Sequence, residues 1–251
     1  MSDPHVSPHP VLPAYYETHD QRTRFVRRLF DDTAPYYDRI NEIFSLGSGA
    51  RYRRECLLRA GLRPGLRVAD IAIGTGLIAR EAVRIVGQDS NVVGLDISAG
   101  MLAIAHSKLR IPLVQGAADR LPFASGAVDF VTMGYALRHV SDLLAAFSEF
   151  QRVLRPGGTV LLLEIARPTK RFTRAVVSGY LGGLVPILCR WVTGQATTRT
   201  LMRYYWDTIE HCVPPEIIMD ALRDAGFTDI RCDTAFDLLR SYSARKGPAV
   251  Q

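Results

Sequence analysis

The sequence has few of the features that mark secreted, membrane-spanning or zinc-binding proteins. Its 251 residues include four cysteines and six histidines, and none of them has the spacing of a metal or redox site. No run of about 20 apolar residues occurs, as a membrane-spanning helix requires. The chain also does not open with a basic stretch leading into an apolar one, as a secretory signal does. We therefore expect reduced thiols, no bound metal and a cytoplasmic location.

Lysine is also scarce, because it occurs only at Lys108, Lys170 and Lys246 although the net charge is +6. The basicity comes from arginine spread along the chain, so we expect no nucleic-acid partner. One basic cluster precedes a mostly apolar segment, 175–188, that is too short to span a bilayer. This arrangement is typical of an element that lies on an anionic membrane or covers a hydrophobic substrate; a buried lid helix is the alternative. The cluster consists of Arg167, Lys170, Arg171 and Arg174.

The composition is that of one apolar globular unit, with 47% hydrophobic residues and a mean hydropathy of +0.04. Apolar segments alternate with helical patterns, which predicts a parallel sheet covered by helices on both faces. The segments expected as strands are 67–72, 91–96, 112–115, 128–133 and 159–165.

Around this core we expect four further parts. They are a flexible tail at 1–22, an N-terminal helical cap at 23–60, a helical lid at 167–213 and, at 214–251, a helix with antiparallel strands that complete the sheet. The core itself spans 61–166. The sequence leaves open whether the protein forms a homodimer.

The most informative feature is a turn with two glycines between two expected strands. The first strand runs into Asp70-Ile71-Ala72-Ile73-Gly74-Thr75-Gly76, and the next ends at Asp96. Glycine lets the backbone approach a ligand closely, and a carboxylate at the end of the second strand suits the two hydroxyls of a ribose. This order predicts a nucleotide-cofactor site. An ordinary tight turn is the alternative for the glycines alone.

The turn lacks the third glycine of the dinucleotide-binding motif, because Ala79 stands in its place. It also contains Asp70, which would repel a pyrophosphate but attract a cofactor that carries an ammonium and a sulfonium group. The pattern therefore indicates S-adenosylmethionine, with S-adenosylhomocysteine as the product.

Further segments resemble the ubiquinone/menaquinone biosynthesis C-methyltransferases, the UbiE type, over residues 24–245. The first match is Y-D-x-x-N-x-x-x-S-x-G from Tyr37 to Gly47, followed by the basic-aromatic-basic run Arg51-Tyr52-Arg53. The others are Gly116-Ala117-Ala118-Asp119-x-Leu121-Pro122-Phe123, then 129–140, Arg152-Val153-Leu154-Arg155-Pro156-Gly157-Gly158 and Leu163-Glu164-x-x-x-Pro168. The resemblance implies an α/β fold of class I methyltransferase type, with a Rossmann-like seven-stranded sheet and helices on both faces.

The resemblance also implies roles for the cofactor residues. Gly74, Thr75 and Gly76 line the methionine end, beside Asp70 and Ala72. Asp96 binds the ribose, and Ile97 and Met101 enclose the adenine. Ala117 replaces an Asp or Asn of the family, so the adenine contact passes to the backbone near Ala118 or to Asp119. Gly134 contributes only its backbone.

For the reaction, the resemblance implies methylation of a ring carbon of a hydrophobic quinol or phenol. Arg138 is the expected partner of a phenolate, and His139, which replaces an asparagine, is the candidate base, with a turn-capping histidine as the alternative. Tyr37 is expected to close over the cofactor. The expected substrate residues are Tyr135, Arg138, Tyr205 and Trp206, unless the last two are only lid core.

Two other functions stay open at this point. One is N- or O-methylation of a specialised metabolite or lipid, because His139, Ala136, Ala166 and Ala117 depart from the family pattern. The other is binding of the cofactor without catalysis.

Overall fold

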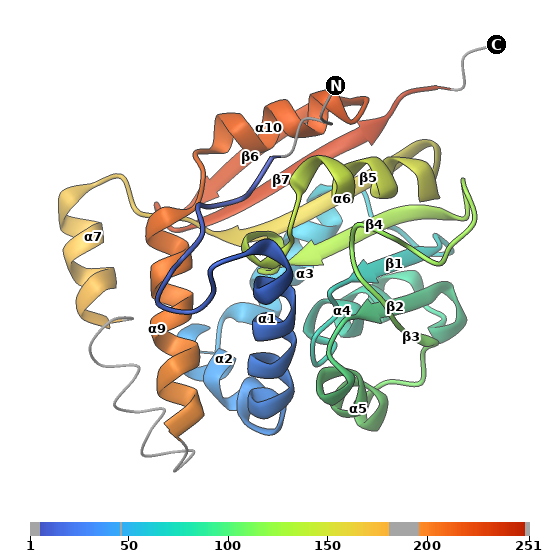
Figure 1. The fold of residues 1–251 in the computed structure, drawn as a ribbon. Coiled ribbons are helices and arrows are strands. Elements are labelled where there is room, and N and C mark those ends of the chain that lie inside the picture. Colours follow the sequence, from blue (N-terminus) through green and yellow to red (C-terminus); the bar gives the residue numbers. More distant parts are fainter. Residues whose placement is uncertain (1–5, 46, 181–195, 249–251) are drawn as a thin grey trace.

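A single seven-stranded sheet forms the centre of the molecule (Figure 1), in the order β3-β2-β1-β4-β5-β7-β6. The computed structural model describes residues 6–45, 47–180 and 196–248. β1 to β5 run parallel to one another, and β7 runs antiparallel to both β5 and β6. The strands are β1 (Val68–Ile71), β2 (Val92–Asp96), β3 (Leu113–Gln115), β4 (Val128–Gly134), β5 (Leu154–Ile165), β6 (Phe227–Ala235) and β7 (Leu239–Lys246).

The helices cover both faces and the carboxyl edge of this sheet. They are α1 (His19–Thr33), α2 (Tyr37–Ser45), α3 (Gly49–Arg59), α4 (Leu77–Val86), α5 (Ala99–Lys108), α6 (Leu143–Val153), α7 (Arg171–Val177), α9 (Ala196–His211) and α10 (Pro215–Asp224). Short 3₁₀ turns are η1 (Ala34–Tyr36), η2 (Asp89–Asn91) and η3 (Leu137–His139).

Two hydrophobic clusters sandwich the sheet. On one face, Phe147 and Phe150 of α6 and Leu222 of α10 are buried against β4 and β5. On the other, Leu57 of α3 and Ile78 of α4 are buried among residues of the same sheet. Every residue of β1 is buried, as expected for a central parallel strand with helices on both sides. The fold class predicted from the sequence is therefore confirmed.

The first four strands lie within one residue of their expected positions, but β5 begins at Leu154, five residues before the expected 159. The segment Pro156-Gly157-Gly158 has the composition of a turn. It nevertheless lies within β5. Leu154 pairs with Val128 on one side of this segment, and Thr159 pairs with Phe130 on the other side, after a shift in register. The irregularity absorbs the extra residues, as a β-bulge does.

The expectation of a flexible tail at 1–22 is wrong for the described residues from Val6 onward. His9, Leu12 and Tyr16 are buried, and backbone hydrogen bonds join Val6 to Leu143 and Pro8 to Val213. The segment is rich in proline and histidine, which suggested weak order. Its hydrogen-bond partners Leu143 and Val213 lie more than 100 residues away in the sequence, and local sequence patterns do not reveal such contacts.

A third hydrophobic cluster lies at the carboxyl edge of the sheet and joins α1, α2 and α9. It includes Val26 and Leu29 of α1, Ile40 of α2 and Tyr204 of α9. The N-terminal segment and the helices after β5 thus pack against each other over the strand ends. Residues 181–195, which contain Trp191 and most of the apolar segment expected in the lid, lie outside the described residues.

Candidate active site

A cavity open to solvent lies at the carboxyl ends of β1, β2 and β4. The chain passes from β1 to β2 on one side and to β4 on the other, and such a reversal of strand order leaves a crevice at the strand ends. The cofactor residues expected from the sequence that line this cavity are Ala72, Gly74, Asp96, Ile97, Met101, Ala117, Ala118, Asp119 and Gly134.

The turn after β1 places its backbone against the cavity in an unusual conformation. Gly74 and Gly76 have φ angles of +57° and +87°, which glycine adopts without strain. Ala72 has a φ of +55° and Tyr135, after β4, a φ of +60°. Non-glycine residues in this region cost roughly 1 to 3 kcal/mol each and concentrate at functional sites. Both strained residues line the cavity.

Asp96 is buried at the end of β2 and is held by backbone donors. Gly74 N donates to its Oδ2 at 2.8 Å and Ser98 N donates to its Oδ1 at 2.9 Å. Burial raises the pKa of Asp96 to about 6, although these donors favour the charged form. The carboxylate is therefore mainly ionised at pH 7. Each oxygen keeps a further lone pair, so the group can accept from the two hydroxyls of a ribose.

Asp70, Thr75 and Gly76 support the cavity but do not line it. Asp70 accepts from Ala79 N at 3.0 Å and from Thr132 Oγ1 at 2.6 Å, and thereby joins the start of α4 to β4. Burial raises its pKa to about 7. Gly76 is the residue at the start of α4. The carboxylate of Asp70 thus has a structural role here, although the sequence pattern suggested a role in attracting the cofactor.

Beyond Asp96 the lining of the cavity is mainly apolar. Ile97 and Met101 follow Asp96 and line it together, and Ala117 to Asp119 form the other wall. A Cβ at position 134 would lie 2.1 Å from Ile78 Cδ1, so any larger residue there would displace the end of that side chain. These observations fit an adenosine group, whose ribose meets Asp96 and whose base lies between Ile97 and Met101.

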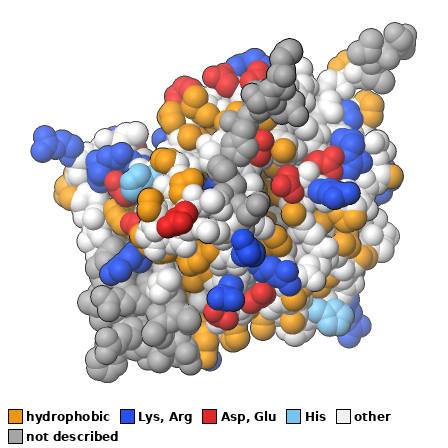
Figure 2. Space-filling model, viewed as in Figure 1, with side chains coloured by type: hydrophobic (Ala, Val, Ile, Leu, Met, Phe, Trp, Pro, Cys, Tyr) orange, Lys and Arg blue, Asp and Glu red, His pale blue; other side chains and the backbone are white. Residues whose placement is uncertain are grey.

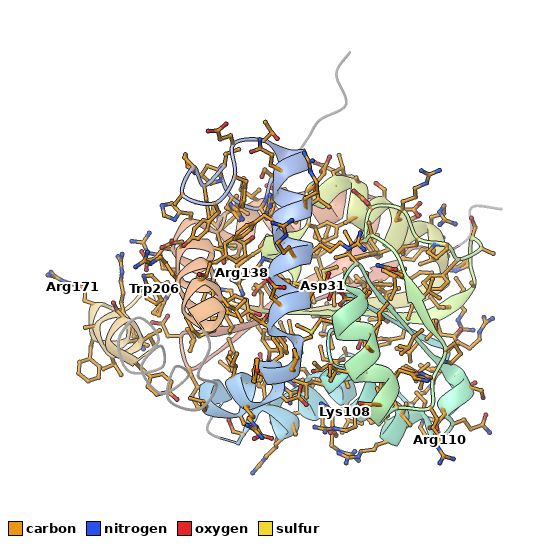
Figure 3. The ribbon with its side chains drawn as sticks, turned by 60° about the horizontal axis from the view of Figure 1, so that its bottom comes forward. Asp31, Lys108, Arg110, Arg138, Arg171 and Trp206 are labelled. Atoms are coloured by element: carbon orange, nitrogen blue, oxygen red, sulfur yellow. The ribbon has the colours of Figure 1, made fainter. Side chains whose placement is uncertain are left out.

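The N-terminal cap closes the cavity with residues that the sequence patterns did not identify. Thr23, Val26 and Phe30 of α1 line it, as does Tyr37, which was expected. Their signal is only the helical apolar spacing of α1, which equally fits a buried core. The cap is fixed to the core through Asp31, which accepts from Ser98 Oγ at 2.6 Å and Gly100 N at 2.9 Å. Figure 3 shows Asp31 between α1 and α5.

A second contact holds the cap at the other end of the cavity. Asp38, at the start of α2, accepts hydrogen bonds from Thr75 Oγ1 and from Lys108 Nζ. The expected cofactor residue Thr75 therefore reaches the cap. It joins the glycine turn to α2.

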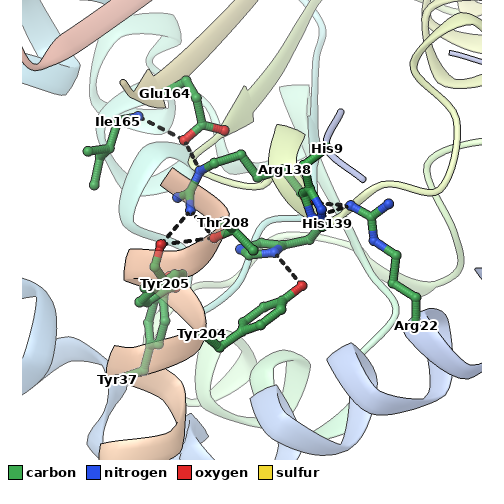
Figure 4. Close-up of polar contacts among 10 residues, drawn as sticks. All are labelled: His9, Arg22, Tyr37, Arg138, His139, Glu164, Ile165, Tyr204, Tyr205 and Thr208. Carbon is green, nitrogen blue, oxygen red and sulfur yellow. Dashed lines mark hydrogen bonds and ion pairs between the residues drawn. The ribbon is translucent and has the colours of Figure 1, made fainter. Parts of the chain in front are cut away.

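His139 lines the cofactor cavity and is partly buried, with the ring of Tyr204 beside it (Figure 4). Its Nδ1 lies 3.3 Å from the Tyr204 hydroxyl, and its ring contacts those of Phe30 and Tyr205. The Nε2 atom is buried and has no hydrogen-bond partner among the described residues. Burial, then the charges of Arg138 and Arg22, hold the pKa of His139 well below 6.5. The imidazole is therefore neutral at pH 7.

Arg138 is fully buried and paired. Its Nε donates to Glu164 Oε1 at 2.9 Å and its Nη1 donates to Thr208 Oγ1 at 2.7 Å. The charge of Glu164 raises the pKa of Arg138 against the opposing effect of burial, so the guanidinium stays charged. Breaking such a pair leaves an uncompensated buried charge, which costs roughly 3 to 5 kcal/mol.

A network from the N-terminal segment holds the η3 turn that carries Arg138 and His139. The Arg22 guanidinium donates to the carbonyl oxygen of Arg138 and to His9 Nε2. Burial, with the charge of Arg22, lowers the pKa of His9 to about 4. His9 and Arg22, both in the segment expected as a flexible tail, thus position the candidate base.

A second cavity shares Tyr37 and Tyr135 with the first. Tyr205 and Arg138, both expected as substrate residues, line this second cavity. The Tyr37 and Tyr205 hydroxyls are 2.8 Å apart and join α2 to α9. The rest of the wall is mainly apolar and extends to Val177 and Tyr180.

Trp206 lines neither cavity, so the expectation that it forms an acceptor wall is not supported by its position. It is partly buried in the cluster that joins the cap to α9. Figure 3 shows it on the side of α9 that faces α7. Neighbouring positions on a helix point in different directions, so Tyr205 faces the cavity while Trp206 does not.

The two cavities have opposite charge. The acidic residues Asp96 and Asp119 line the first cavity, and its described lining contains no lysine or arginine. Arg53 and Arg138 line the second, and no acidic residue is among its described lining. A cationic ligand therefore suits the first cavity and an anionic ligand suits the second.

Within the described part of the chain, no group of three or more His, Cys, Asp or Glu side chains could hold a metal ion. None of the described helices is long and apolar enough to cross a bilayer. Cys56, Cys212 and Cys232 are free thiols. Figure 2 shows basic and acidic side chains interspersed on one face of the molecule.

The model of the ubiE/COQ5 methyltransferase family matches residues 16–236 of the chain. The chain is 34% identical over 221 residues to the ubiquinone/menaquinone biosynthesis C-methyltransferase UbiE of Coxiella burnetii, covering 85% of this chain and 86% of the relative. It is 32% identical over 220 residues to a demethylmenaquinone methyltransferase of Symbiobacterium thermophilum, covering 84% and 87%.

Solved structures show the same fold at low identity. The [4+2]-cyclase SpnF matches with a TM-score of 0.66 and 17% identity over 97% of this chain and 99% of that one. A methyltransferase dependent on S-adenosylmethionine from Thermotoga maritima, titled a possible histamine N-methyltransferase, matches with a TM-score of 0.62 and 17% identity over 88% and 99%. These likenesses concern the fold alone.

Proposed function

The chain belongs to the ubiE/COQ5 methyltransferase family, and we propose that it methylates a ring carbon of a hydrophobic quinol or phenol. Its cofactor is S-adenosylmethionine, which supplies a methyl group already activated by the positive sulfonium. The observation that carries this proposal is the pair of adjoining cavities with opposite charge, which meet at Tyr37 and Tyr135. The relatives named for quinone methylation align with most of the chain and point to the same class of acceptor.

Residues of the first cavity bind the cofactor. Asp96 accepts hydrogen bonds from the ribose hydroxyls, Ile97 and Met101 enclose the adenine, and the backbone at Gly74 and Gly134 borders the methionine portion. Asp119 adds a second negative charge beside this cavity. The acidic lining favours a cationic cofactor over the neutral product, which helps the product to leave.

Residues between the cavities prepare the acceptor. A ring carbon becomes nucleophilic when the neighbouring hydroxyl loses its proton, and a neutral imidazole can accept that proton. His139 can do so at Nε2 only in the tautomer in which its Nδ1 carries hydrogen and donates to the Tyr204 hydroxyl. The fixed charge of Arg138 stabilises the resulting phenolate without moving.

The acceptor's tail follows the apolar wall of the second cavity toward Val177 and Tyr180. Outside this wall, Phe172 of α7 is 81% exposed and Phe236 is 84% exposed. Asp237 accepts from the backbone of Thr169 and Lys170, which brings Phe236 beside the start of α7. We propose that this exposed patch, Phe172 and Phe236, rests on an anionic membrane that supplies the acceptor.

Two of the four clustered basic residues already have partners in the protein. Arg167 and Arg174 pair with Glu210 of α9 at 3.6 and 2.8 Å. Lys170 and Arg171 are exposed beside Phe172. They are the basic side chains that a membrane surface would meet.

The experiment that tests the proposed function uses S-adenosylmethionine with a deuterated methyl group. The protein is incubated with a panel of demethylated quinols, phenols and lipid amines, and the products are fragmented in a mass spectrometer. We expect the label on a ring carbon of a quinol or phenol, and less label in a reaction with Asp96→Ala when the cofactor is below the concentration that saturates the parent. Label on nitrogen or oxygen, or no product from a protein that binds S-adenosylhomocysteine, would contradict the proposal.

A further inference from the structure

Arg53 is a buried cation without a committed acidic partner. It lies on α3, its exposed fraction is 6%, and its side chain lines the second cavity. Its Nε atom is buried and makes no hydrogen bond within the described structure. Burial lowers the pKa of Arg53 because it disfavours the charged form. A buried guanidinium is costly unless an anion compensates it.

The nearby carboxylate that could compensate Arg53 is already shared by other arginines. Glu81 of α4 lies 4.0 Å from Arg54, 3.9 Å from Arg80 and 2.6 Å from Arg84. Three arginine side chains therefore share the single negative charge of Glu81 before Arg53 is counted. The charge of Arg53, at the wall of the cavity, is thus not fully neutralised.

Two further features beside Arg53 favour an anion. The first is Tyr135, whose pKa burial raises and the Arg53 charge lowers, so the two groups interact directly. Tyr135 also lines the cofactor cavity. The second is the amino end of α3, because Ser48 and Gly49 line the same cavity as Arg53. The first turn of a helix carries a partial positive charge.

The other arginine of the cavity is not available in the same way. Arg138 is compensated by Glu164 at 2.9 Å, and its Nη1 already donates to Thr208. It adds a fixed field, whereas Arg53 keeps unused hydrogen-bonding capacity. No acidic residue is among the described lining of this cavity, so an anionic ligand there would supply the negative charge that the lining lacks.

We propose that Arg53, together with Tyr135 and the amino end of α3, forms a subsite that binds an ionised oxygen of the acceptor, either a ring phenolate or a ring carboxylate. Because Tyr135 borders both cavities, an acceptor held by this subsite lies next to the methyl donor. The subsite thus selects acceptors that carry an acidic oxygen on the side of α3. This inference rests on the proposed function for the identity of the second ligand.

The test measures equilibrium binding of ring ligands that cannot be turned over. The probes are 2-naphthoate, its neutral counterpart 2-naphthamide, and 2-naphthol, each titrated calorimetrically into protein saturated with S-adenosylhomocysteine. We expect the parent to bind the carboxylate at least about tenfold more tightly than the amide, the scale of one charge-assisted hydrogen bond. Arg53→Gln should remove this preference, whereas Arg53→Lys should retain part of it.

Arg54→Gln is the matched control, because Arg54 is the next residue, is exposed and also lies near Glu81. It should bind all three probes as the parent does. A pH series with 2-naphthol distinguishes the two sources of negative charge. Binding to the parent that tightens as the naphthol ionises, with no such change in Arg53→Gln, indicates a phenolate; a preference confined to the naphthoate indicates a carboxylate.

The inference is overturned if Arg53→Gln, shown to be folded by its thermal transition, still binds the carboxylate more tightly than the amide. It is equally overturned if the parent binds S-adenosylhomocysteine but does not distinguish the two probes. Failure of the parent to bind S-adenosylhomocysteine is a different result, because it contradicts the proposed function. The preference for the carboxylate over the amide is then measured with the protein in the absence of S-adenosylhomocysteine.

Discussion

At the scale of single residues, Asp96 is the side chain on which cofactor affinity depends most directly. Asp96→Ala removes two charge-assisted hydrogen bonds to the ribose, each worth roughly 1.5 to 3 kcal/mol. Calorimetry should therefore show at least about a tenfold weaker binding of S-adenosylhomocysteine. Asp119→Ala is a useful comparison, because it removes a charge from the same cavity without the backbone contacts of Asp96. Unchanged affinity in Asp96→Ala would mean that Asp96 does not bind the ribose of the cofactor.

His139 makes a separate prediction about turnover. If its imidazole accepts the acceptor's proton, the rate at saturating substrate rises with pH as the imidazole loses its proton. Because burial and Arg138 hold the pKa of His139 well below 6.5, this rise should be complete below pH 6.5. His139→Ala should lose roughly 10² to 10⁴-fold in turnover, with S-adenosylhomocysteine still bound.

His139→Asn is the sharper variant, since it keeps a polar side chain of similar reach but no base. A proton-accepting role requires that it stay impaired and lose the acid limb of the pH profile, while the exposed His106→Asn behaves as the parent. Full activity of His139→Asn with an unchanged profile would mean that the residue only orients its surroundings.

At the same scale, the sequence identified the cavity better than the acceptor site. Gly74, Asp96, Ile97 and Met101 stand within one continuous strand-turn-helix pattern, so their order along the chain already determines that they meet. Thr23 and Phe30 come from α1 and have no local pattern that distinguishes a cavity wall from core. Asp70 shows the opposite case: its position in the motif is right, but its hydrogen bonds to Ala79 and Thr132 direct it away from the ligand.

At the scale of elements, the contact between α1 and α5 controls how firmly the cap covers the cofactor. Asp31→Ala removes two hydrogen bonds at the start of α5, a change comparable to loss of a helix cap, about 1 kcal/mol. We expect S-adenosylhomocysteine to bind about threefold to tenfold more weakly, because Phe30 and Val26 on the same helix would close less completely. The neighbouring Asp32→Ala should leave calorimetric affinity as in the parent, and an equal loss in both variants would refute a specific contact.

The elements around α7 make a prediction about membranes. The double variant Phe172→Ser and Phe236→Ser removes two exposed aromatic side chains from one surface, and each buried aromatic contributes roughly 2 kcal/mol on leaving water. Co-sedimentation with vesicles that contain anionic lipid should fall severalfold at low salt. Ile217→Ser, on α10, removes an exposed apolar side chain elsewhere and should sediment as the parent does. Equal retention of all three proteins would mean that the patch does not meet lipid.

At the scale of the whole molecule, the buried carboxyl of Asp70 makes stability depend on pH. Its pKa is raised from 3.8 to about 7 in the folded protein, so the unfolded chain releases this proton first. Between pH 4 and 7 this group therefore reduces the free energy of unfolding as pH rises, by at most about 1.4 kcal/mol for each step of one in pH. Buried His9, whose pKa is lowered to about 4, has the opposite effect over part of the same range.

The comparison of parent and Asp70→Asn isolates this contribution. Denaturant unfolding across pH 4 to 7 should show that the parent loses stability relative to Asp70→Asn as pH rises, while His9 acts equally in both. A constant difference between the two proteins across this range would contradict a raised pKa at position 70.

For the whole fold, the sequence was a reliable guide where contacts are local or periodic. The apolar runs of β1, β2 and β4 and the helical patterns between them place the sheet without reference to distant residues. The early start of β5 and the packing of His9 and Tyr16 depend instead on partners far along the chain, Val128, Arg138 and Tyr204 among them. The local composition suggested a turn at 156–158 and a tail at 1–22, because it contains no information about contacts with distant residues.

The two tyrosines shared by the cavities have a thermodynamic consequence. A ligand in either cavity contacts Tyr37 and Tyr135 and restricts whatever motion these side chains retain, and the hydroxyl contact of Tyr37 with Tyr205 extends that restriction to α9. Once one ligand has fixed this common wall, the other meets a surface that has already lost its freedom. Cofactor and acceptor then strengthen each other's binding by the same factor, because a coupling free energy between two sites is reciprocal.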